Sequence, residues 1–232
     1  MEVEDSVKEA FSSEVDTYWI NRNVITSFAC PNVSLFRLIG SAIGNLDNKK
    51  ILEVGFAHGA DLIECKRRGA DIVGLDLNPK FVINVKQTTN CDVRQFRAGT
   101  DLIPFEQPFD LIYSNDTIYY LNDDELKQFL EQCSTKMKAE GSLIVQFIET
   151  DLKRKDNVYP NRSSFDLDFL SQYLPHQIHN EDNPIRFLDT DKVVSIAKDS
   201  NLKLVGSKRM LQSYDLNESE IRVEKYLIFC KQ

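Results

Sequence analysis

The segment from Lys50 to Asp76 constrains the fold most, because it follows the order strand, glycine turn, helix, strand and acidic residue. Its apolar start is typical of a strand buried on both faces of a sheet. Gly55 and Gly59 bracket a turn where the backbone passes close to a ligand and a Cβ would obstruct it. The helix that follows points its N-terminal amides at the same place. Asp76 ends the second strand, where a carboxylate accepts hydrogen bonds from both hydroxyls of a ribose. The segment therefore predicts a nucleoside-binding half-site.

Two cofactors fit this turn. Read from Gly55, the turn follows Gly-x-Ala-x-x-Ala, a degenerate dinucleotide fingerprint that is weak evidence by itself. Read from Glu53, it follows Glu-x-Gly-x-x-x-Gly, and in this form the sequence resembles the class I S-adenosylmethionine-dependent methyltransferases. The first interpretation predicts NAD as the cofactor, and the second predicts S-adenosylmethionine.

Three further segments extend the resemblance to the methyltransferases. Residues 109–116 resemble the family's fourth strand, residues 117–121 resemble the segment after it, and residues 137–145 resemble its turn into the fifth strand. Glu140 stands where the family carries the first glycine of that turn. An NAD-dependent enzyme has no reason to carry these three segments, so the ordered set favours a methyltransferase.

Composition and charge narrow the class of protein. The chain has 232 residues, of which 42% are hydrophobic and 28% charged, as is ordinary for one soluble globular domain. The net charge of −8 and the absence of a basic stripe argue against nucleic acid as the main substrate. No apolar run approaches the ~20 residues of a membrane span, and the acidic N-terminus has no signal-peptide pattern. Five dispersed cysteines without CxxC spacing indicate reduced thiols. We expect a cytoplasmic protein that binds no membrane.

The alternation of strands and helices predicts an α/β fold with a parallel sheet covered on both faces. The resemblance implies a Rossmann-like, doubly wound and mostly parallel sheet of seven strands, with a C-terminal antiparallel strand. We expect a single domain with an N-terminal helical cap (1–48), a cofactor-binding core (49–149), an insertion after strand five (150–188) and a C-terminal helix and strand pair (189–232). A long polar segment between regular elements is typical of a functional lid, so the insertion is predicted to cover the methyl acceptor.

The pattern also predicts element boundaries inside the core. We expect a strand over residues 93–98, a helix over residues 123–138 that begins with three carboxylates, and a turn ending at Gly141 before a strand over 142–148. Asn78 is predicted to cap a helix that has Pro79 at its first position.

The cofactor contacts are predicted mainly from the resemblance. A buried Glu53 organises the glycine loop and the methionine end of the cofactor, and Asp76 binds the ribose. Thr100 replaces an aspartate with which many relatives hold the adenine amino group, so this contact departs from the family pattern. The full set that we expect to contact S-adenosylmethionine is Tyr18, Glu53, Gly55, Ala57, Gly59, Asp76, Leu77, Gly99, Thr100, Ser114 and Asn115.

The acceptor side offers four candidate catalytic residues. Tyr119 and Tyr120 follow the fourth strand, where many small-molecule methyltransferases carry a histidine or aromatic residue, although core aromatics are an equal interpretation. His176 and His179 lie in the insertion, where either one has the side-chain chemistry of a general base near neutral pH. Their spacing also allows a metal site, but no second compact set of ligands supports one, so we predict no metal.

Arg162 and Arg186 are the candidate acceptor-binding residues, because a guanidinium can hold a carboxylate or phosphate with two parallel hydrogen bonds. The predicted reaction is methyl transfer to an oxygen or nitrogen of a small polar metabolite, such as a sugar or a phosphorylated building block. The alternatives are a non-catalytic S-adenosylmethionine-binding regulatory or scaffold protein on the same fold and, more distantly, an NAD-dependent enzyme.

Overall fold

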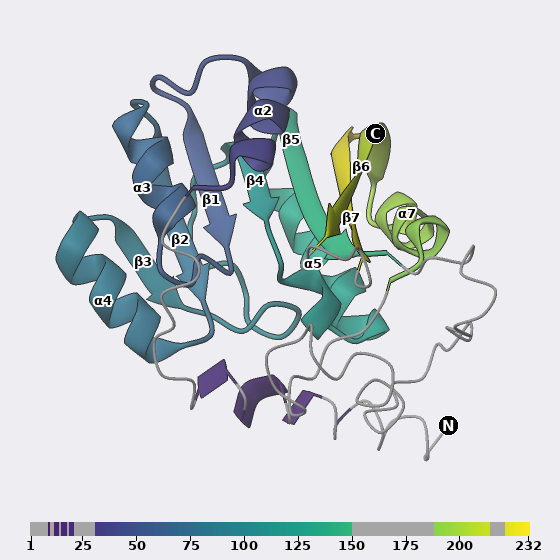
Figure 1. The fold of residues 1–232 in the computed structure, drawn as a ribbon, viewed down its shortest axis with the longest axis horizontal. Helices are drawn as coiled ribbons and strands as arrows, with labels where there is room; N and C mark the ends of the chain where they lie inside the picture. Colours follow the sequence, from purple (N-terminus) through teal and green to yellow (C-terminus); the bar gives the residue numbers. More distant parts are fainter. Residues whose placement is uncertain are drawn as a thin grey trace.

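The described strands form one mixed sheet in the order β3-β2-β1-β4-β5-β7-β6, with helices on both faces (Figure 1). The structure is a computed structural model, and the residues that it describes are 9, 12–13, 15–17, 19–20, 31–149, 188–213 and 221–232. The predicted α/β, Rossmann-like fold with seven strands and an antiparallel C-terminal strand is confirmed.

Strands and helices alternate along the core of the chain. The elements up to the centre of the sheet are α2 (Val33–Ile43), β1 (Lys50–Val54), α3 (Ala60–Arg67), β2 (Asp71–Asp76), α4 (Pro79–Thr89) and β3 (Asp92–Gln95). The elements that follow are β4 (Phe109–Ser114), the 3₁₀ helix η2 (Ile118–Tyr120), α5 (Asp123–Lys136), β5 (Met137–Ile148), α7 (Thr190–Asp199), β6 (Leu202–Ser213) and β7 (Ile221–Lys231).

The strand order reverses between β1 and β4. Strands β1 to β5 are parallel, and β7 runs antiparallel between β5 and β6. In the register, Glu53 of β1 pairs with Gly74 of β2 on one side and with Tyr113 of β4 on the other. In open α/β sheets, ligands bind at such a reversal, outside the carboxyl ends of the strands. The topology therefore places a site where β1 and β4 end.

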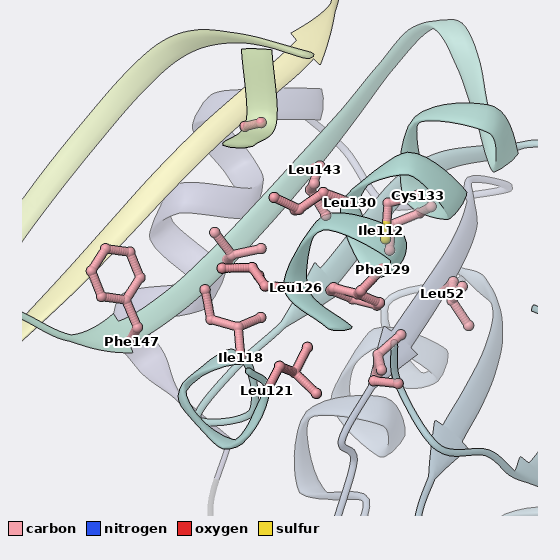
Figure 2. Packing of buried hydrophobic residues seen from close by; sticks show 14 of the residues in the cluster. Leu52, Ile112, Ile118, Leu121, Leu126, Phe129, Leu130, Cys133, Leu143 and Phe147 are labelled. Atoms are coloured by element: carbon pink, nitrogen blue, oxygen red, sulfur yellow. The ribbon is translucent and has the colours of Figure 1, made fainter. Parts of the chain in front are cut away.

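Two hydrophobic clusters cover the two faces of the sheet. On one face, α5 packs side chains such as Leu126, Phe129 and Cys133 against Ile112 and Leu143 of β4 and β5 (Figure 2). On the other face, apolar side chains of α2, α3 and α4 cover the alternate residues of the same strands, and the fully buried members include Leu35, Leu62 and Val85. Burial on both faces explains why the central strands read as continuous apolar runs.

Helices α4 and α5 begin at residues whose side chains accept hydrogen bonds from their free amides. Asn78 accepts a hydrogen bond from the backbone of Lys80, and Pro79 follows it, as predicted from the sequence. Asn122 and Glu125 form a capping box at the start of α5, with acidic residues in its first turn. These caps fix the chain direction just beyond the carboxyl ends of β2 and β4.

Three predicted boundaries were wrong. Strand β3 ends at Gln95 instead of residue 98, and α5 ends at Lys136 and leads directly into β5 without a separate turn. The pairing of β5 with β4 moves from Met137↔Phe109 to Ser142↔Leu111, so residues 138–141 bulge out of register. Gly141 lies in this bulge, where a Cβ would come within 2.8 Å of the Phe109 carbonyl oxygen. The residues of the predicted turn therefore belong to strand β5, because this strand already pairs with β4 at Met137.

Candidate cofactor and acceptor site

The glycine loop after β1 has a backbone that ordinary residues adopt only under strain. Gly55 and Gly59 have φ angles of 84° and 75°, and Ala57 between them has a φ of 45°. A Cβ on Gly55 would overlap the Thr117 Oγ1. The Thr117 hydroxyl is in turn within hydrogen-bond distance of the Val54 carbonyl oxygen, at 3.3 Å. The loop is therefore shaped by the segment after β4 as well as by its own glycines.

Asp76 ties the glycine loop to the end of β2. Its Oδ2 accepts a hydrogen bond from the Ala57 amide and its Oδ1 accepts one from the Asn78 amide, both at 2.8 Å. The side chain is buried, and burial raises the pKa of Asp76 to about 6, although the two amides act in the opposite direction. Each carboxylate oxygen can accept more than one hydrogen bond, so the predicted ribose contact fits this geometry.

Glu53 lies on β1 beneath the loop and is 4% exposed. Burial raises the pKa of this carboxyl well above its usual range, and nearby Asp61 raises it further. Its Oε2 has no hydrogen-bond partner among the described residues. A buried carboxyl group in this state would gain from a cationic or hydrogen-bond-donating ligand. Glu53 and the loop amides therefore fit the ammonium and carboxylate of a methionine moiety.

The loop after β3 is held mainly by α5. Gly99 has a φ of 80°, and a Cβ there would lie 2.6 Å from the Glu125 carbonyl oxygen. The Thr100 Oγ1 accepts a hydrogen bond of 2.7 Å from the Arg97 guanidinium. Leu77 is half-buried beside Asp76, and its carbonyl oxygen accepts a hydrogen bond from the Gln95 side chain. These contacts explain the loop's shape, and the predicted adenine contacts of Gly99, Thr100 and Leu77 stay predictions.

Two predicted residues at the end of β4 have different surroundings. The buried Ser114 hydroxyl donates to the Val54 carbonyl oxygen at 3.1 Å and so links β4 to β1. The Asn115 amide nitrogen donates to Asp116, and its oxygen faces the Asn32 amide nitrogen at 3.4 Å. Asn115 is therefore placed at the border between the glycine loop and the next strands, while Ser114 contributes to the sheet itself.

A second polar group lies near the carboxyl ends of β4 and β5, where the antiparallel strand β7 begins. Gln146 of β5 pairs with Tyr226 of β7, and its Oε1 accepts a hydrogen bond of 2.7 Å from the Asp116 amide. The Tyr226 hydroxyl accepts a hydrogen bond of 3.2 Å from the Asn32 side chain. The Tyr119 hydroxyl donates to the Asp116 carboxylate at 3.1 Å. These side chains form a hydrogen-bonded row next to the glycine loop.

Sequence reasoning missed part of this row. Asn32, Gln146 and Tyr226 come from segments far apart in the chain, and only the fold brings them together beside Asp116. One signal was available, because Gln146 interrupts an otherwise apolar strand. Tyr119 and the neighbouring Tyr120, in contrast, were predicted candidates, and both are buried with ring centroids 4.7 Å apart.

A cavity of about 910 Å³ adjoins this edge of the sheet. It lies between described residues of the N-terminal segment, the loop after β3 and the start of α5. Its polar lining includes Ser12, Asp16, Arg97, Thr100, Asn122 and Glu125. Of the predicted cofactor contacts, Thr100 lines this cavity, whereas the residues of the glycine loop do not.

The remaining predicted residues are not placed. Tyr18, Arg162, Arg186, His176 and His179 lie outside the described residues, as does the predicted lid (150–188) apart from its last residue. Within the described ranges, no group of three or more His, Cys, Asp or Glu side chains is arranged to hold a metal ion. None of the described helices has the length and apolar character needed to cross a membrane.

The cofactor-binding core matches a known family. A family model described as a methyltransferase domain matches residues 51–141. The matched range begins at β1, contains the glycine loop and Asp76, and ends in β5. The match favours S-adenosylmethionine over NAD, the two cofactors that the turn alone allowed.

Individual relatives are distant. The chain is 22% identical over 189 residues to a ubiquinone biosynthesis O-methyltransferase of Pelagibacter ubique. This alignment covers 80% of this chain and 71% of that protein. It is 25% identical over 103 residues to a phosphoethanolamine N-methyltransferase of Plasmodium falciparum. This alignment covers 43% of this chain and 39% of that protein.

A solved structure shares the fold. The magnesium protoporphyrin IX methyltransferase of Synechocystis PCC 6803, solved with bound S-adenosylhomocysteine, has a TM-score of 0.61 and 12% identity. The alignment covers 99% of this chain and 98% of that one. At this identity the similarity concerns the fold, and it extends over both the core and the C-terminal strand pair.

Proposed function

The chain belongs to the class I S-adenosylmethionine-dependent methyltransferases, and from this premise we propose that it methylates an oxygen or nitrogen atom of a small polar metabolite. A sugar or a phosphorylated building block would suit the polar groups described above. The named relatives are consistent with this range, since one is called an O-methyltransferase and another a phosphoethanolamine N-methyltransferase.

The observation that carries the proposal is the polar row near the carboxyl ends of β4 and β5, in which Gln146 is buried. The orientation of the Gln146 side-chain amide is fixed, because its oxygen accepts a hydrogen bond from the Asp116 backbone amide and a 180° rotation would break this bond. Its nitrogen is buried and has no hydrogen-bond partner among the described residues. A buried donor without an acceptor costs about 1–3 kcal/mol, which a polar ligand or water would offset. An apolar acceptor would leave this cost in place.

The chain's own residues prepare the methyl-transfer site in two ways. Asp76, the glycine loop and Glu53 are arranged to hold the ribose and the methionine moiety, and when bound, S-adenosylmethionine supplies a methyl group already activated by its sulfonium. Asn115 and Asp116 lie where β4 ends, between the cofactor contacts and the polar row. We assign to the Asp116 carboxylate, which accepts a hydrogen bond from Tyr119, the role of taking a proton from an incoming hydroxyl or amine.

The acceptor is proposed to be a small molecule and not nucleic acid. The chain has 28 basic and 36 acidic residues. The described lining of the cavity carries the acidic side chains Glu9, Asp16, Asp124 and Glu125 against one arginine, Arg97. Such a surface repels a phosphate backbone, which is bound chiefly by Lys and Arg.

The test is methyl transfer from labelled S-adenosylmethionine. Purified protein would be incubated with a metabolite extract and with panels of amines, alcohols, sugars and phosphorylated compounds, and labelled products identified by mass spectrometry. Transfer RNA and duplex DNA serve as comparison substrates. We expect labelled small molecules and none of the label in nucleic acid. Saturable S-adenosylhomocysteine binding without turnover on any panel would favour a non-catalytic binding protein instead.

A further inference from the structure

The hydrogen-bonded row near the ends of β4 and β5 has an acidic side chain at each end. At one end, the Asp116 carboxylate accepts hydrogen bonds from Tyr119 and from the Asn115 amide, both at 3.1 Å. At the other end, the Tyr226 hydroxyl is the donor to Glu224 at 3.5 Å. Tyr226 and Glu224 occupy alternate positions on β7, so their side chains point to the same face of the sheet. The row therefore extends from one carboxylate to another.

Asn32 joins the two ends of the row and adds a third carboxyl group. Its side-chain nitrogen is 3.2 Å from the Tyr226 hydroxyl and 3.4 Å from the Asn115 oxygen. Its backbone amide, just before α2, donates to Asp61 of α3 at 2.6 Å. Burial raises the pKa of Asp61 to about 6, and the nearby charge of Asp116 raises it further. Acidic side chains from three different elements therefore gather around one asparagine.

The Tyr226 hydroxyl lies in the electric field of two of these carboxylates. Burial raises the pKa of Tyr226, and the charges of Glu224 and Asp116 raise it further. The hydroxyl therefore keeps its proton near neutral pH and acts in hydrogen bonding and not as a base. A cation beside this hydroxyl would be attracted by both carboxylates. The electrostatics of the row thus fit a positively charged group.

Gln146 adds a hydrogen-bond donor to the row. Its side chain is 1% exposed and lies opposite Tyr226 in the pairing of β5 with β7, so both side chains share one face of the sheet. Its Oε1 is held by the Asp116 amide, so Nε2, which is bonded to the same carbon, also stays within the row. This nitrogen has no hydrogen-bond partner among the described residues. A buried donor in this state requires an acceptor oxygen on a ligand.

We propose that the methyl acceptor is a small cationic amine with an uncharged oxygen on a neighbouring carbon, as in an amino alcohol. The ammonium group is held between Asp116 and Glu224, and the neighbouring oxygen accepts a hydrogen bond from Gln146 Nε2. Asp116 is half-buried whereas Glu224 and Gln146 are buried, so the ligand enters past Asp116. A phosphate or carboxylate at this place would be repelled by the acidic side chains. The inference rests on the proposed function and narrows its acceptor class.

The same contacts prepare the acceptor nitrogen for methylation. An ammonium group has no lone pair, so it must first lose one proton, and the Asp116 carboxylate takes that proton. The neutral nitrogen then forms a bond to the methyl carbon, while the carbon–sulfur bond breaks and leaves its electron pair on sulfur. The methylated nitrogen is again positively charged, so Glu224 continues to stabilise it, and Asp116 releases its proton to water.

Calorimetry on the unaltered chain, with saturating S-adenosylhomocysteine, tests the ligand class. The probes are amino alcohols of increasing length that begin with ethanolamine, each compared with the alkylamine and the diol of the same carbon number. We expect the amino alcohols to bind about 10-fold more tightly than the alkylamines, which lack the oxygen for Gln146, and the diols to bind most weakly. Diols that bind as tightly as amino alcohols, or no binding by any amino alcohol, would overturn the inference.

Glu224→Gln removes one carboxylate and keeps the size of the side chain. Amino alcohol affinity should fall by about 10- to 100-fold, and S-adenosylhomocysteine affinity should stay within about twofold. Glu149→Gln is the matched control, because it changes the net charge equally just beyond β5, where Glu149 lies 3.1 Å from Arg209 and 4.0 Å from Lys225. This control should bind amino alcohols normally. Equal losses in both variants would contradict a direct contact with Glu224, and if Glu224→Gln does not fold, the comparison of probes on the unaltered chain decides.

Labelled methyl transfer separates this inference from the proposed function. Label on the nitrogen of amino alcohols supports both. Label on the oxygen of amine-free sugars or alcohols keeps the proposed function and overturns the amine inference. Amino alcohol binding without methyl transfer to any acceptor keeps the amine site and rejects the proposed reaction.

Discussion

The two halves of the carboxyl edge are built differently. Beyond β1 and β2, the candidate cofactor site consists of backbone amides, glycines and the carboxyl groups of Glu53 and Asp76, all from residues 53–78. Near the carboxyl ends of β4 and β5, the candidate acceptor site consists of side chains from residues 32, 116, 146 and 226, with Asn115 at its border with the cofactor site. The first half is local in sequence and rigid in backbone, whereas the second is assembled from distant segments. We expect this division where the cofactor is the same throughout a family and the acceptor differs between its members.

The largest expected effect tests the rigid half. Gly55→Ala should abolish measurable S-adenosylhomocysteine binding in calorimetry, because the new Cβ overlaps Thr117 at a left-handed φ. We expect an affinity loss above about 100-fold, together with destabilisation of about 2–4 kcal/mol.

Gly44→Ala is the control for backbone strain alone. Gly44 also has a positive φ, of 71°, but nothing lies within 4 Å of its missing Cβ. It should lose about 1–2 kcal/mol of stability and bind normally. Partial rescue of Gly55→Ala by Thr117→Ala would confirm the steric cause, and equal affinities of the Gly55 and Gly44 variants would contradict it.

A smaller effect is expected at Asp76. Asp76→Ala removes the acceptor of two backbone amides and of the predicted ribose hydroxyls. Cofactor affinity should fall by about 10- to 100-fold, and stability by about 1–3 kcal/mol. Calorimetry and urea unfolding measure the two losses separately. A folded variant with unchanged affinity would exclude the ribose contact.

The pH dependence of S-adenosylhomocysteine binding is a second test of the predicted contact between Asp76 and the ribose. The pKa of Asp76 is about 6 in the folded protein, so its carboxylate gains a proton as the pH falls through 6 and loses capacity to accept hydrogen bonds. S-adenosylhomocysteine affinity should therefore fall by roughly tenfold from pH 7 to pH 5. Stability changes in the opposite direction, because a raised folded pKa means that ionisation costs stability, and this cost is relieved below pH 6.

Asp61 provides the control for this pH effect, since burial also raises its pKa to about 6. Asp61→Asn should keep the fall in affinity, whereas Asp76→Asn should flatten it. If the fall in affinity persists in Asp76→Asn and disappears in Asp61→Asn, the titrating residue is Asp61 and our assignment to Asp76 is wrong.

The smallest effect is expected in the acceptor half. Gln146→Met keeps the size of a buried side chain but removes its hydrogen bond with the Asp116 amide. With an acceptor found in the labelling test, we expect kcat/KM to fall by about 5- to 10-fold, and S-adenosylhomocysteine affinity to stay within about twofold. Gln128→Met, on the exposed face of α5, is the control. If S-adenosylhomocysteine affinity falls in Gln146→Met as much as kcat/KM does, the proposed division between the two halves is wrong.

The sequence predicted the fold and the local half of the site because both depend on short-range patterns. The apolar runs gave the central strands, and Asn78 and Pro79 gave the start of α4. The end of β3 and the start of β5 were wrong, since a bulge opposite β4 is set by strand pairing and not by local preference. Gly99 was predicted as an adenine contact, but its surroundings show that packing against Glu125 already requires a glycine.

By itself, the sequence determined the glycine turn, the acidic residue after β2 and the alternation that makes a doubly wound sheet. These features lie within a few tens of residues, where backbone conformation and hydrophobic period leave direct signals. Only the tertiary structure decided that Asn32, Gln146 and Tyr226 meet and that Thr117 fills the space beside Gly55. Such contacts depend on sheet order and helix packing, which join residues far apart in the chain.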